Sequence, residues 1–208
     1  MISTSHNTLT IGVLALQGDF YLHLRTLSKL PCRAMEVRTA HELEGVDGLI
    51  IPGGESTAID RLIKRDGLGD LIRQRNLSGT LPIFGTCMGL ILLAKDIENS
   101  EQYRLALMDI TVNRNAYGRQ VDSFEADLHL TNGAGELSGE STGLPYHGVF
   151  IRAPVVKRVG KSVSVLAEHN NQPVLIKEGD LLAASFHPEI TDDTRIHELF
   201  LKIVKKQD

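Results

Sequence analysis

The chain has 208 residues, of which 42% are hydrophobic and 23% charged, a size and composition that fit one globular domain with a sizeable core. Its formal net charge is −4, and acidic and basic residues are interspersed, which argues against a nucleic-acid-binding or membrane-surface protein. Two cysteines do not make a disulfide framework, and the first apolar run is too short for a signal peptide or membrane span, so we expect a cytoplasmic protein.

The first half of the chain alternates predicted strands with predicted helices. Short apolar runs bounded by turn residues predict strands at Thr10–Leu16, Ala34–Arg38, Asp47–Ile51 and Leu81–Phe84. Apolar residues at helical spacing predict helices over Phe20–Leu30, after an N-cap at Ser56, and over Gly89–Ile97. This order predicts an α/β fold, in which a mostly parallel central sheet is flanked by helices and joined by right-handed crossovers.

The second half is predicted to contain short, additional antiparallel strands joined by close turns. We expect these strands at Ile110–Asn113, Phe124–Leu130, Gly148–Ile151, Ser162–Glu168, Val174–Lys177 and Leu181–Phe186. A C-terminal helix is predicted from an apolar face made of Ile196, Leu199, Phe200 and Ile203. We expect one domain over residues 1–208, with a flexible N-terminus over residues 1–8 and an exposed loop over residues 131–146.

The sharpest local feature is a G-x-C-x-G sequence from Gly85 to Gly89, placed between a predicted strand and a predicted helix. Its glycines permit the tight, strained turn that holds a nucleophile, here Cys87, out of the fold. The positive end of the following helix favours the reactive thiolate, and the backbone N–H of Met88 faces the position of an oxyanion. Read alone, Cys87 fits equally well as a buried structural cysteine beside packing glycines.

A thiol nucleophile needs a base and a group that orients the base. His187 and Glu189 supply both, and they point the same way on an extended segment because they lie two residues apart. Glu189 would then hold the imidazole in the tautomer that accepts the thiol proton. A solvent-facing His-Pro-Glu turn is the alternative interpretation.

A second glycine turn, from Pro52 to Ser56, ends the third predicted strand. Because strand ends carry the site in a parallel sheet, we expect this turn and Cys87 at the same sheet edge. A backbone N–H of Gly54 could complete the oxyanion hole. The alternative is an ordinary strand-to-helix turn capped by Ser56, whereas a P-loop is excluded because no GK[ST] follows.

Six segments together resemble the class I (triad-type) glutamine amidotransferase family, and within it the glutaminase subunits of two-component pyridoxal 5′-phosphate synthases. They are IGVLALQGDF, VDGLIIPGGEST, PIFGTCMGLILLAK, NRNAYGRQVDSFEADL, GVFIRAP and SFHPE, which span about Ile11 to Glu189. The GTCxG and HPE sequences alone indicate only the superfamily, and the other segments indicate this branch. The resemblance implies a flavodoxin-like fold and a single glutaminase domain.

The resemblance also implies a role for particular residues. It makes Cys87 the nucleophile, His187 the general base and acid, and Glu189 the orienting carboxylate. The implied contacts to the substrate glutamine are Gly54, Glu55, Ser56, Arg114, Ile151 and Arg152. An arginine fork suits the α-carboxylate of glutamine, although without the resemblance both arginines would be interpreted as surface charges.

Three further expectations come from comparing this chain with the pattern of the family. Gln17 and Gly18 correspond to a segment near the oxyanion turn and the partner interface. Met88 stands where the family usually has alanine, and we expect it to narrow the mouth of the pocket without removing activity, since only its backbone N–H is needed. The segment over residues 131–146 is longer than the compact turn that is common in bacterial relatives.

The implied activity is hydrolysis of the side-chain amide of L-glutamine through a glutamyl thioester, without a metal or organic cofactor. The implied partner is a barrel synthase built as a double ring, which receives the ammonia through a channel and makes pyridoxal 5′-phosphate. Two alternatives remain open: a glutaminase that supplies another pathway, such as histidine biosynthesis, and a non-catalytic member whose elbow cysteine is a redox sensor. A sensor needs no paired base, so the pair of His187 and Glu189 argues against the second.

Overall fold

The computed structural model describes residues 8–16, 19–54, 63, 67–114, 123–131 and 144–206. The predictions for Gln17, Gly18, Glu55 and Ser56 lie outside these ranges, as do those for residues 1–7 and for residues 132–143 of the expected loop. Within the described ranges, no helix combines the length and the apolar character needed to cross a lipid bilayer.

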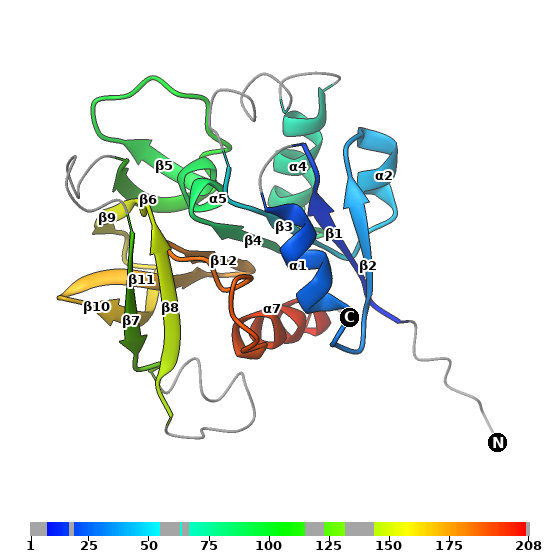
Figure 1. Cartoon of the computed structure of the whole chain (residues 1–208). Helices are drawn as coiled ribbons and strands as arrows, with labels where there is room; N and C mark the ends of the chain where they lie inside the picture. The colour runs from blue at the N-terminus through cyan, green and yellow to red at the C-terminus, as the bar shows by residue number, and fades with distance from the viewer. Residues whose placement is uncertain are drawn as a thin grey trace.

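A seven-stranded sheet runs through the centre of the molecule (Figure 1). Its strands, in spatial order, are β10 (Ser164–His169), β11 (Gln172–Glu178), β12 (Leu181–Ala184), β4 (Ile83–Thr86), β3 (Gly48–Ile51), β1 (Thr10–Leu14) and β2 (Arg33–Val37). The pairs from β12 to β2 are parallel, whereas β10, β11 and β12 pair antiparallel. This arrangement confirms the predicted α/β class with a mostly parallel sheet and additional antiparallel strands in the C-terminal half.

Helices cover both faces of the sheet, because the side chains of its central strands are apolar on both sides. They are α1 (Phe20–Leu27), α2 (Ala40–Glu44), α4 (Leu68–Leu77), α5 (Met88–Leu93) and α7 (Arg195–Lys205). Consecutive side chains of β3 point to opposite faces, so Leu49 and Ile51 pack in the cluster that contains α2, α4 and α5. Ile50 packs in the cluster that contains α1 and α7.

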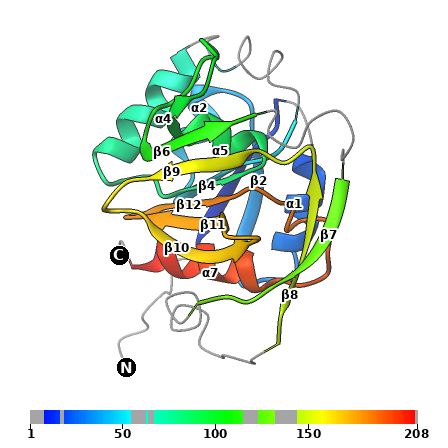
Figure 2. The same ribbon diagram turned by 90° about the vertical axis from the view of Figure 1, so that its left-hand side faces the viewer.

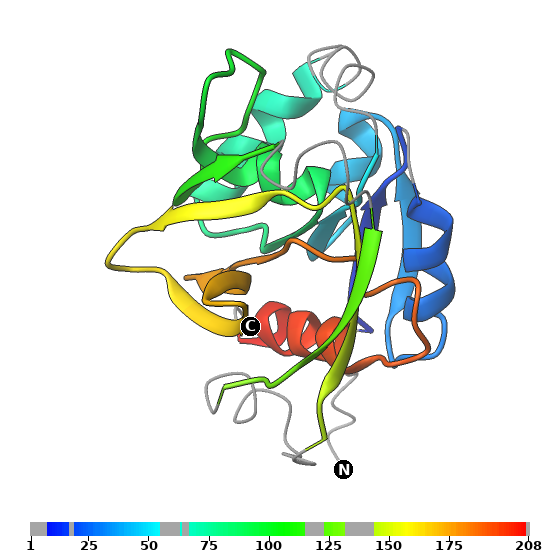
Figure 3. The same cartoon turned by 60° about the vertical axis from the view of Figure 1, so that its left-hand side comes forward.

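Two smaller sheets flank the main one, as Figures 2 and 3 show. The first consists of β5 (Ala94–Ile97), β6 (Met108–Asn113) and β9 (Val155–Val159), and the second is the antiparallel pair of β7 (Ser123–Leu128) and β8 (Tyr146–Ile151). The N–H of His187 donates to the carbonyl of Val149 on β8 at 2.8 Å. This hydrogen bond fastens the second small sheet to the segment that follows β12.

The predicted helix over Gly89–Ile97 is wrong in its second half. The helix α5 ends at Leu93, and Ala94 takes φ −59° and ψ 139°, from which the chain continues as β5 and pairs with β6. The sequence from Leu90 to Ala94 is apolar throughout. Periodicity alone does not distinguish a buried helix from a buried strand in such a run.

Three observed elements have no counterpart among the predicted ones: α2, α4 and β9. The signal for α2 is a capping box, in which Thr39 and Glu42 exchange side-chain and backbone hydrogen bonds over a helix of five residues. The helix α4 follows Gly67, whose φ is 70°, and its fully buried apolar side chains are those of Leu68 and Ile72. Such a narrow apolar face gives a weak periodic signal.

Candidate active site

The predicted nucleophile, the predicted base and the glycine turn after β3 lie at the carboxyl ends of three neighbouring parallel strands. Gly53 follows β3, Cys87 follows β4 and His187 follows β12, and these strands are adjacent in the sheet (Figure 1). Ligands of open parallel sheets bind at this edge. The order of the strands therefore brings together three residues that are far apart in the sequence.

Cys87 occupies a strained turn between β4 and α5. Its φ is 49° and its ψ is −101°, a conformation that residues other than glycine rarely adopt. The N–H of Cys87 donates to the carbonyl of Ala184 on β12 at 2.8 Å, so the neighbouring strand holds the turn in place. Because α5 begins at the next residue, Met88, the segment has the strand–turn–helix geometry of a nucleophile elbow.

The two glycines of the elbow allow α5 to approach the sheet closely. A Cβ atom on Gly85 would lie 2.6 Å from the carbonyl carbon of Gly89, and a Cβ atom on Gly89 would overlap the carbonyl oxygen of Ile51. Neither contact is with the end of a flexible side chain, so the backbone itself would have to move. The G-x-C-x-G spacing is therefore a packing requirement of this turn.

Gly89→Ala is expected to lower the free energy of unfolding by about 3 kcal/mol, because the added methyl group has no room against the backbone of β3. Urea denaturation of the purified chain measures this change. The matched control is Gly45→Ala, whose added Cβ meets nothing closer than the carbonyl oxygen of Glu42 at 3.9 Å. The control should change the free energy by no more than about 0.5 kcal/mol, and equal losses in both variants would contradict the prediction.

His187 and Glu189 form a buried, hydrogen-bonded pair. His187 Nδ1 lies 2.7 Å from Glu189 Oε1, and the two side chains are 6% and 0% exposed. Burial opposes the ionisation of Glu189, but the imidazoles of His23 and His187 outweigh it and hold the pKa of Glu189 below its usual value. The alternative of a solvent-facing turn is therefore wrong. Since Nδ1 faces Glu189, Nε2 of His187 remains for the thiol proton.

The site keeps His187 charged and close to the nucleophile. Burial lowers the pKa of His187, but its hydrogen bonds to Cys87 and Glu189 raise that pKa to about 10. Gly53 packs against both His187 and Cys87, because a Cβ atom on Gly53 would lie 2.7 Å from His187 Cε1 and 3.4 Å from Cys87 Cβ. The turn after β3 therefore forms one wall of the site and has no room for a side chain.

The last residue of β8 also reaches the nucleophile. The Sγ of Cys87 donates to the carbonyl oxygen of Ile151 at 3.9 Å. Arg152 follows with an exposed side chain and a φ of 45°, and strained backbone of this kind is common beside functional sites. Gly54 is exposed next to Gly53. Of the predicted substrate contacts, Ile151 and Gly54 thus lie beside the nucleophile or the glycine that packs on it.

Arg114 is held by a residue that the sequence does not single out. Its Nη1 donates to Oε1 of Gln102, and Nε2 of Gln102 donates to Sδ of Met88 at 3.8 Å. Met88 is 3% exposed and packs in the apolar core, so the expectation that its side chain narrows the mouth of the pocket is wrong. Gln102 instead connects the elbow to Arg114.

Two buried histidines, His23 and His197, lie behind Glu189 and also escape the sequence motifs. The signal that could have found His23 is its spacing, three residues after Phe20 and four before Leu27 on α1. These intervals place it on the buried face of that helix.

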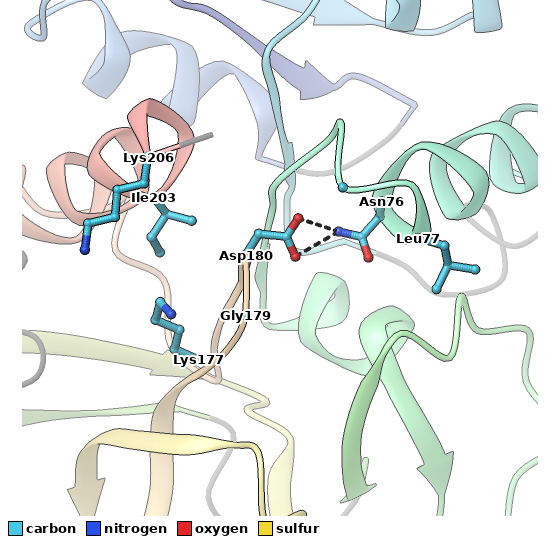
Figure 4. A pocket seen from close by; sticks show the side chains of 8 residues that line it. Asn76, Leu77, Lys177, Gly179, Asp180, Ile203 and Lys206 are labelled. Carbon is cyan, nitrogen blue, oxygen red and sulfur yellow. Dashed lines mark hydrogen bonds between the residues drawn. The ribbon is translucent and has the colours of Figure 1, made fainter. Parts of the chain in front are cut away.

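A hollow of about 440 Å³ lies at the opposite edge of the sheet (Figure 4). Asn76 at the end of α4 donates to the carboxylate of Asp180, at 3.3 and 3.4 Å, and Lys177 and Lys206 line the same hollow. Asp180 precedes β12, whereas His187 follows it. The hollow is therefore separate from the site around Cys87.

Comparison with known proteins identifies the family of the chain. The model of the SNO glutamine amidotransferase family matches residues 13–206. The pyridoxal 5′-phosphate synthase subunit PdxT of Thermus thermophilus is 50% identical over 194 residues, which cover 93% of this chain and 96% of the relative. The protein of the same name from Moorella thermoacetica is 47% identical over 93% of this chain and 98% of its own.

Solved structures give the same result for the fold. The crystal structure of a glutamine amidotransferase that is 48% identical superposes with a TM-score of 0.85, covering 94% of this chain and 98% of that protein. A glutamine amidotransferase from Thermotoga maritima is 12% identical and shares the fold, with a TM-score of 0.62 over 97% of this chain and 86% of its own. From the family match and the relatives at about half identity, the chain belongs to the SNO glutamine amidotransferase family.

Proposed function

We propose that this chain is the glutaminase subunit of a pyridoxal 5′-phosphate synthase, which releases ammonia from L-glutamine and delivers it to a synthase partner for vitamin B6 biosynthesis. The observation that carries the proposal is the position of Cys87 in a strained elbow beside the buried pair of His187 and Glu189. Membership of a glutamine amidotransferase family supports the substrate. The name of the relatives at about half identity supports the pathway.

In the proposed reaction, the thiolate of Cys87 attacks the side-chain carbonyl carbon of glutamine and forms a C–S bond. The C–N bond then breaks, and the imidazolium of His187 gives its proton to the leaving nitrogen, which departs as ammonia. The product on the enzyme is a glutamyl thioester. Water attacks this thioester while His187 accepts a proton from the water, and glutamate leaves as the thiolate of Cys87 is restored.

The proposed oxyanion hole uses the backbone N–H groups of Met88 and Gly54. Met88 directly follows the nucleophile, as one donor of an elbow requires, and Gly54 follows the glycine that packs against Cys87. Removing one such donor from a hydrolase costs about 10²–10³ in rate.

The proposed contacts to the substrate surround these donors. They are Gly54, Glu55, Ser56, Arg114, Ile151 and Arg152, with the arginines taking the α-carboxylate. Gln102 supports this assignment, because it holds the guanidinium of Arg114 from the side of the elbow.

We propose a barrel synthase, assembled as a double ring, as the partner that receives the ammonia through a channel. Gln17 and Gly18 are the proposed interface, and they precede Asp19 and α1, whose histidine lies behind Glu189. We also retain the cytoplasmic location as a prediction, because the two cysteines, Cys32 and Cys87, are both free thiols.

The isolated chain is expected to hydrolyse glutamine slowly and to accelerate at least about tenfold when the synthase is added. Ammonia released without a docked channel would diffuse away, and the turn at Gly53 and Gly54 is rich enough in glycine for a peptide plane to flip and remove an oxyanion donor. Glutamate production, measured as the pyridoxal 5′-phosphate synthase is titrated in, tests both the function and the activation by the partner.

The outcomes of this titration separate the alternatives. Full activity without the synthase would contradict a peptide flip at Gly53 and Gly54 that depends on the partner, and would indicate a preformed oxyanion hole. If the synthase of histidine biosynthesis accelerated glutamate release and the pyridoxal 5′-phosphate synthase did not, the chain would be assigned to histidine biosynthesis. A chain that releases no glutamate under either condition would favour the redox-sensing alternative.

A further inference from the structure

Behind the proposed triad lies a chain of buried polar side chains that the reaction steps above do not use. His23 on α1 and His197 on α7 are both fully buried, and His23 Nδ1 lies 2.9 Å from His197 Nε2. On its other side, His23 Nε2 lies 3.3 Å from Glu189 Oε2 and 3.3 Å from the hydroxyl of Thr86. Thr86 immediately precedes Cys87, so His23 touches both the carboxylate and the strand that carries the nucleophile.

The charge of Glu189 decides which nitrogen of His23 carries the proton. Glu189 Oε2 is buried and has no partner with full hydrogen-bond geometry among the described residues, and His23 Nε2 faces it at 3.3 Å. A lone pair on Nε2 would repel the carboxylate, whereas an N–H there attracts it. With the proton on Nε2, Nδ1 becomes an acceptor, and His197 fills that role by donating from its own Nε2.

We infer that His23 is a positioning residue of the glutaminase site: its Nε2–H fixes Oε2 of Glu189, while His187 Nδ1 holds Oε1, so that the carboxylate has a single orientation. His197 sets the tautomer of His23 from behind. This inference rests on the proposed function, because it acts on the same triad. The support of the triad thus extends to two helices: His23 on α1 faces the carboxylate of Glu189, and His197 on α7 contacts His23.

The directions of the pKa shifts agree with a neutral, donating His23. Burial holds its pKa below the ordinary value, against the opposing effect of Glu189. Burial also lowers the pKa of His197, to about 3, so His197 is neutral as well. The titratable groups that face His23 are Glu189, His187, His197 and Asp19.

The test is His23→Leu, which keeps the bulk of the side chain and removes the donor. In the reconstituted complex, kcat for glutamine should fall about tenfold to a hundredfold, the effect of losing a polar partner of a buried charge, with KM nearly unchanged. The acid limb of the pH profile should move to higher pH, because the buried Glu189 carboxylate loses a stabilising donor. His23→Gln, whose amide N–H reaches the place of Nε2, should recover most of the rate and the acid limb.

Thr26→Val is the matched control, since Thr26 is a buried polar residue on the same helix that bonds to the carbonyl of Leu22. It should leave kcat and the pH profile unchanged. Wild-type kcat and an unmoved acid limb in His23→Leu would overturn the positioning role. So would equal losses in His23→Leu and His23→Gln without a shift of the limb, because these indicate a packing role.

If His23→Leu does not fold, His197→Leu takes its place. This variant should lower kcat several-fold and move the acid limb of the pH profile to higher pH. An unchanged kcat and pH profile in His197→Leu would overturn the role as well. Failure of the proposed function is recognised separately, because the wild-type complex would then release no glutamate in the same assay.

Discussion

Cys87→Ala is expected to abolish glutamine hydrolysis, because no other thiol lies at the carboxyl end of the sheet within the described residues to form the thioester. The fold should persist, because the polar contacts of Sγ, to the carbonyl oxygen of Ile151 at 3.9 Å and to the imidazole of His187, lie outside the two apolar core clusters. The free energy of unfolding should change by no more than about 1 kcal/mol. Glutamate release in the complex with the synthase, together with urea denaturation, measures both effects.

Cys32→Ala is the matched control for this experiment. Cys32 is half-buried, and burial raises the pKa of its thiol, which makes it a poor nucleophile. The control should hydrolyse glutamine at the wild-type rate. A folded Cys87→Ala chain that still releases glutamate would remove Cys87 from the mechanism, and formation of pyridoxal 5′-phosphate from ammonium salts should survive in that variant, because the synthase then needs no glutaminase.

The same variant should lower the pKa of His187 from about 10, because the hydrogen bond to Cys87 is the largest of the effects that raise it. An NMR titration of the ring nitrogens measures this change. A raised pKa in the folded state stabilises the fold fully below the ordinary value of 6.5, and this contribution is lost as pH rises through about 10. The difference in the free energy of unfolding between wild type and variant should therefore vanish over that window, and a difference that does not depend on pH would contradict a charged His187 stabilised by Cys87.

The sequence predicted most of the sheet because apolar runs and turn residues are local signals. The strand after which Cys87 lies and the strand before His187 were both recognised, and the family motifs named the triad. The second half of Gly89–Ile97 was assigned wrongly, since the chain leaves the helix at Ala94 and pairs with β6. That pairing partner lies beyond any local window.

The parts of the site that the sequence did not predict depend on contacts between distant elements. His23, His197 and Gln102 belong to no motif. Each is connected to the site by a side-chain contact with a residue outside its own element. Met88 was expected to narrow the mouth of the pocket because it stands where the family usually has alanine, yet its side chain packs in the core. The helical spacing of His23 from Phe20 and Leu27 is the signal that could have drawn attention to it.

Glu189→Gln is expected to lower kcat by roughly 10²–10⁴, by analogy with the loss of the orienting carboxylate in serine triads. Each oxygen of Glu189 faces an imidazole nitrogen, at 2.7 Å for His187 and 3.3 Å for His23. A carboxylate can accept from both, whereas an amide offers one acceptor and one donor. If the donor turns to His187, its Nδ1 loses its proton and Nε2 gains one, so the ring cannot accept the proton of Cys87.

The rate of glutamate release in the reconstituted complex measures this loss, with Glu198→Gln as the control. Glu198 lies on α7 and accepts a hydrogen bond from the hydroxyl of Thr194 at 2.6 Å, a contact that does not involve the triad. The control should retain the wild-type kcat. If Glu189→Gln also retained it, the imidazole of His187 would be oriented by another group, and Glu189 would serve the packing of the segment after β12. A large loss at Glu189 together with a smaller loss at His23 is the order that two positioning contacts of unequal length predict.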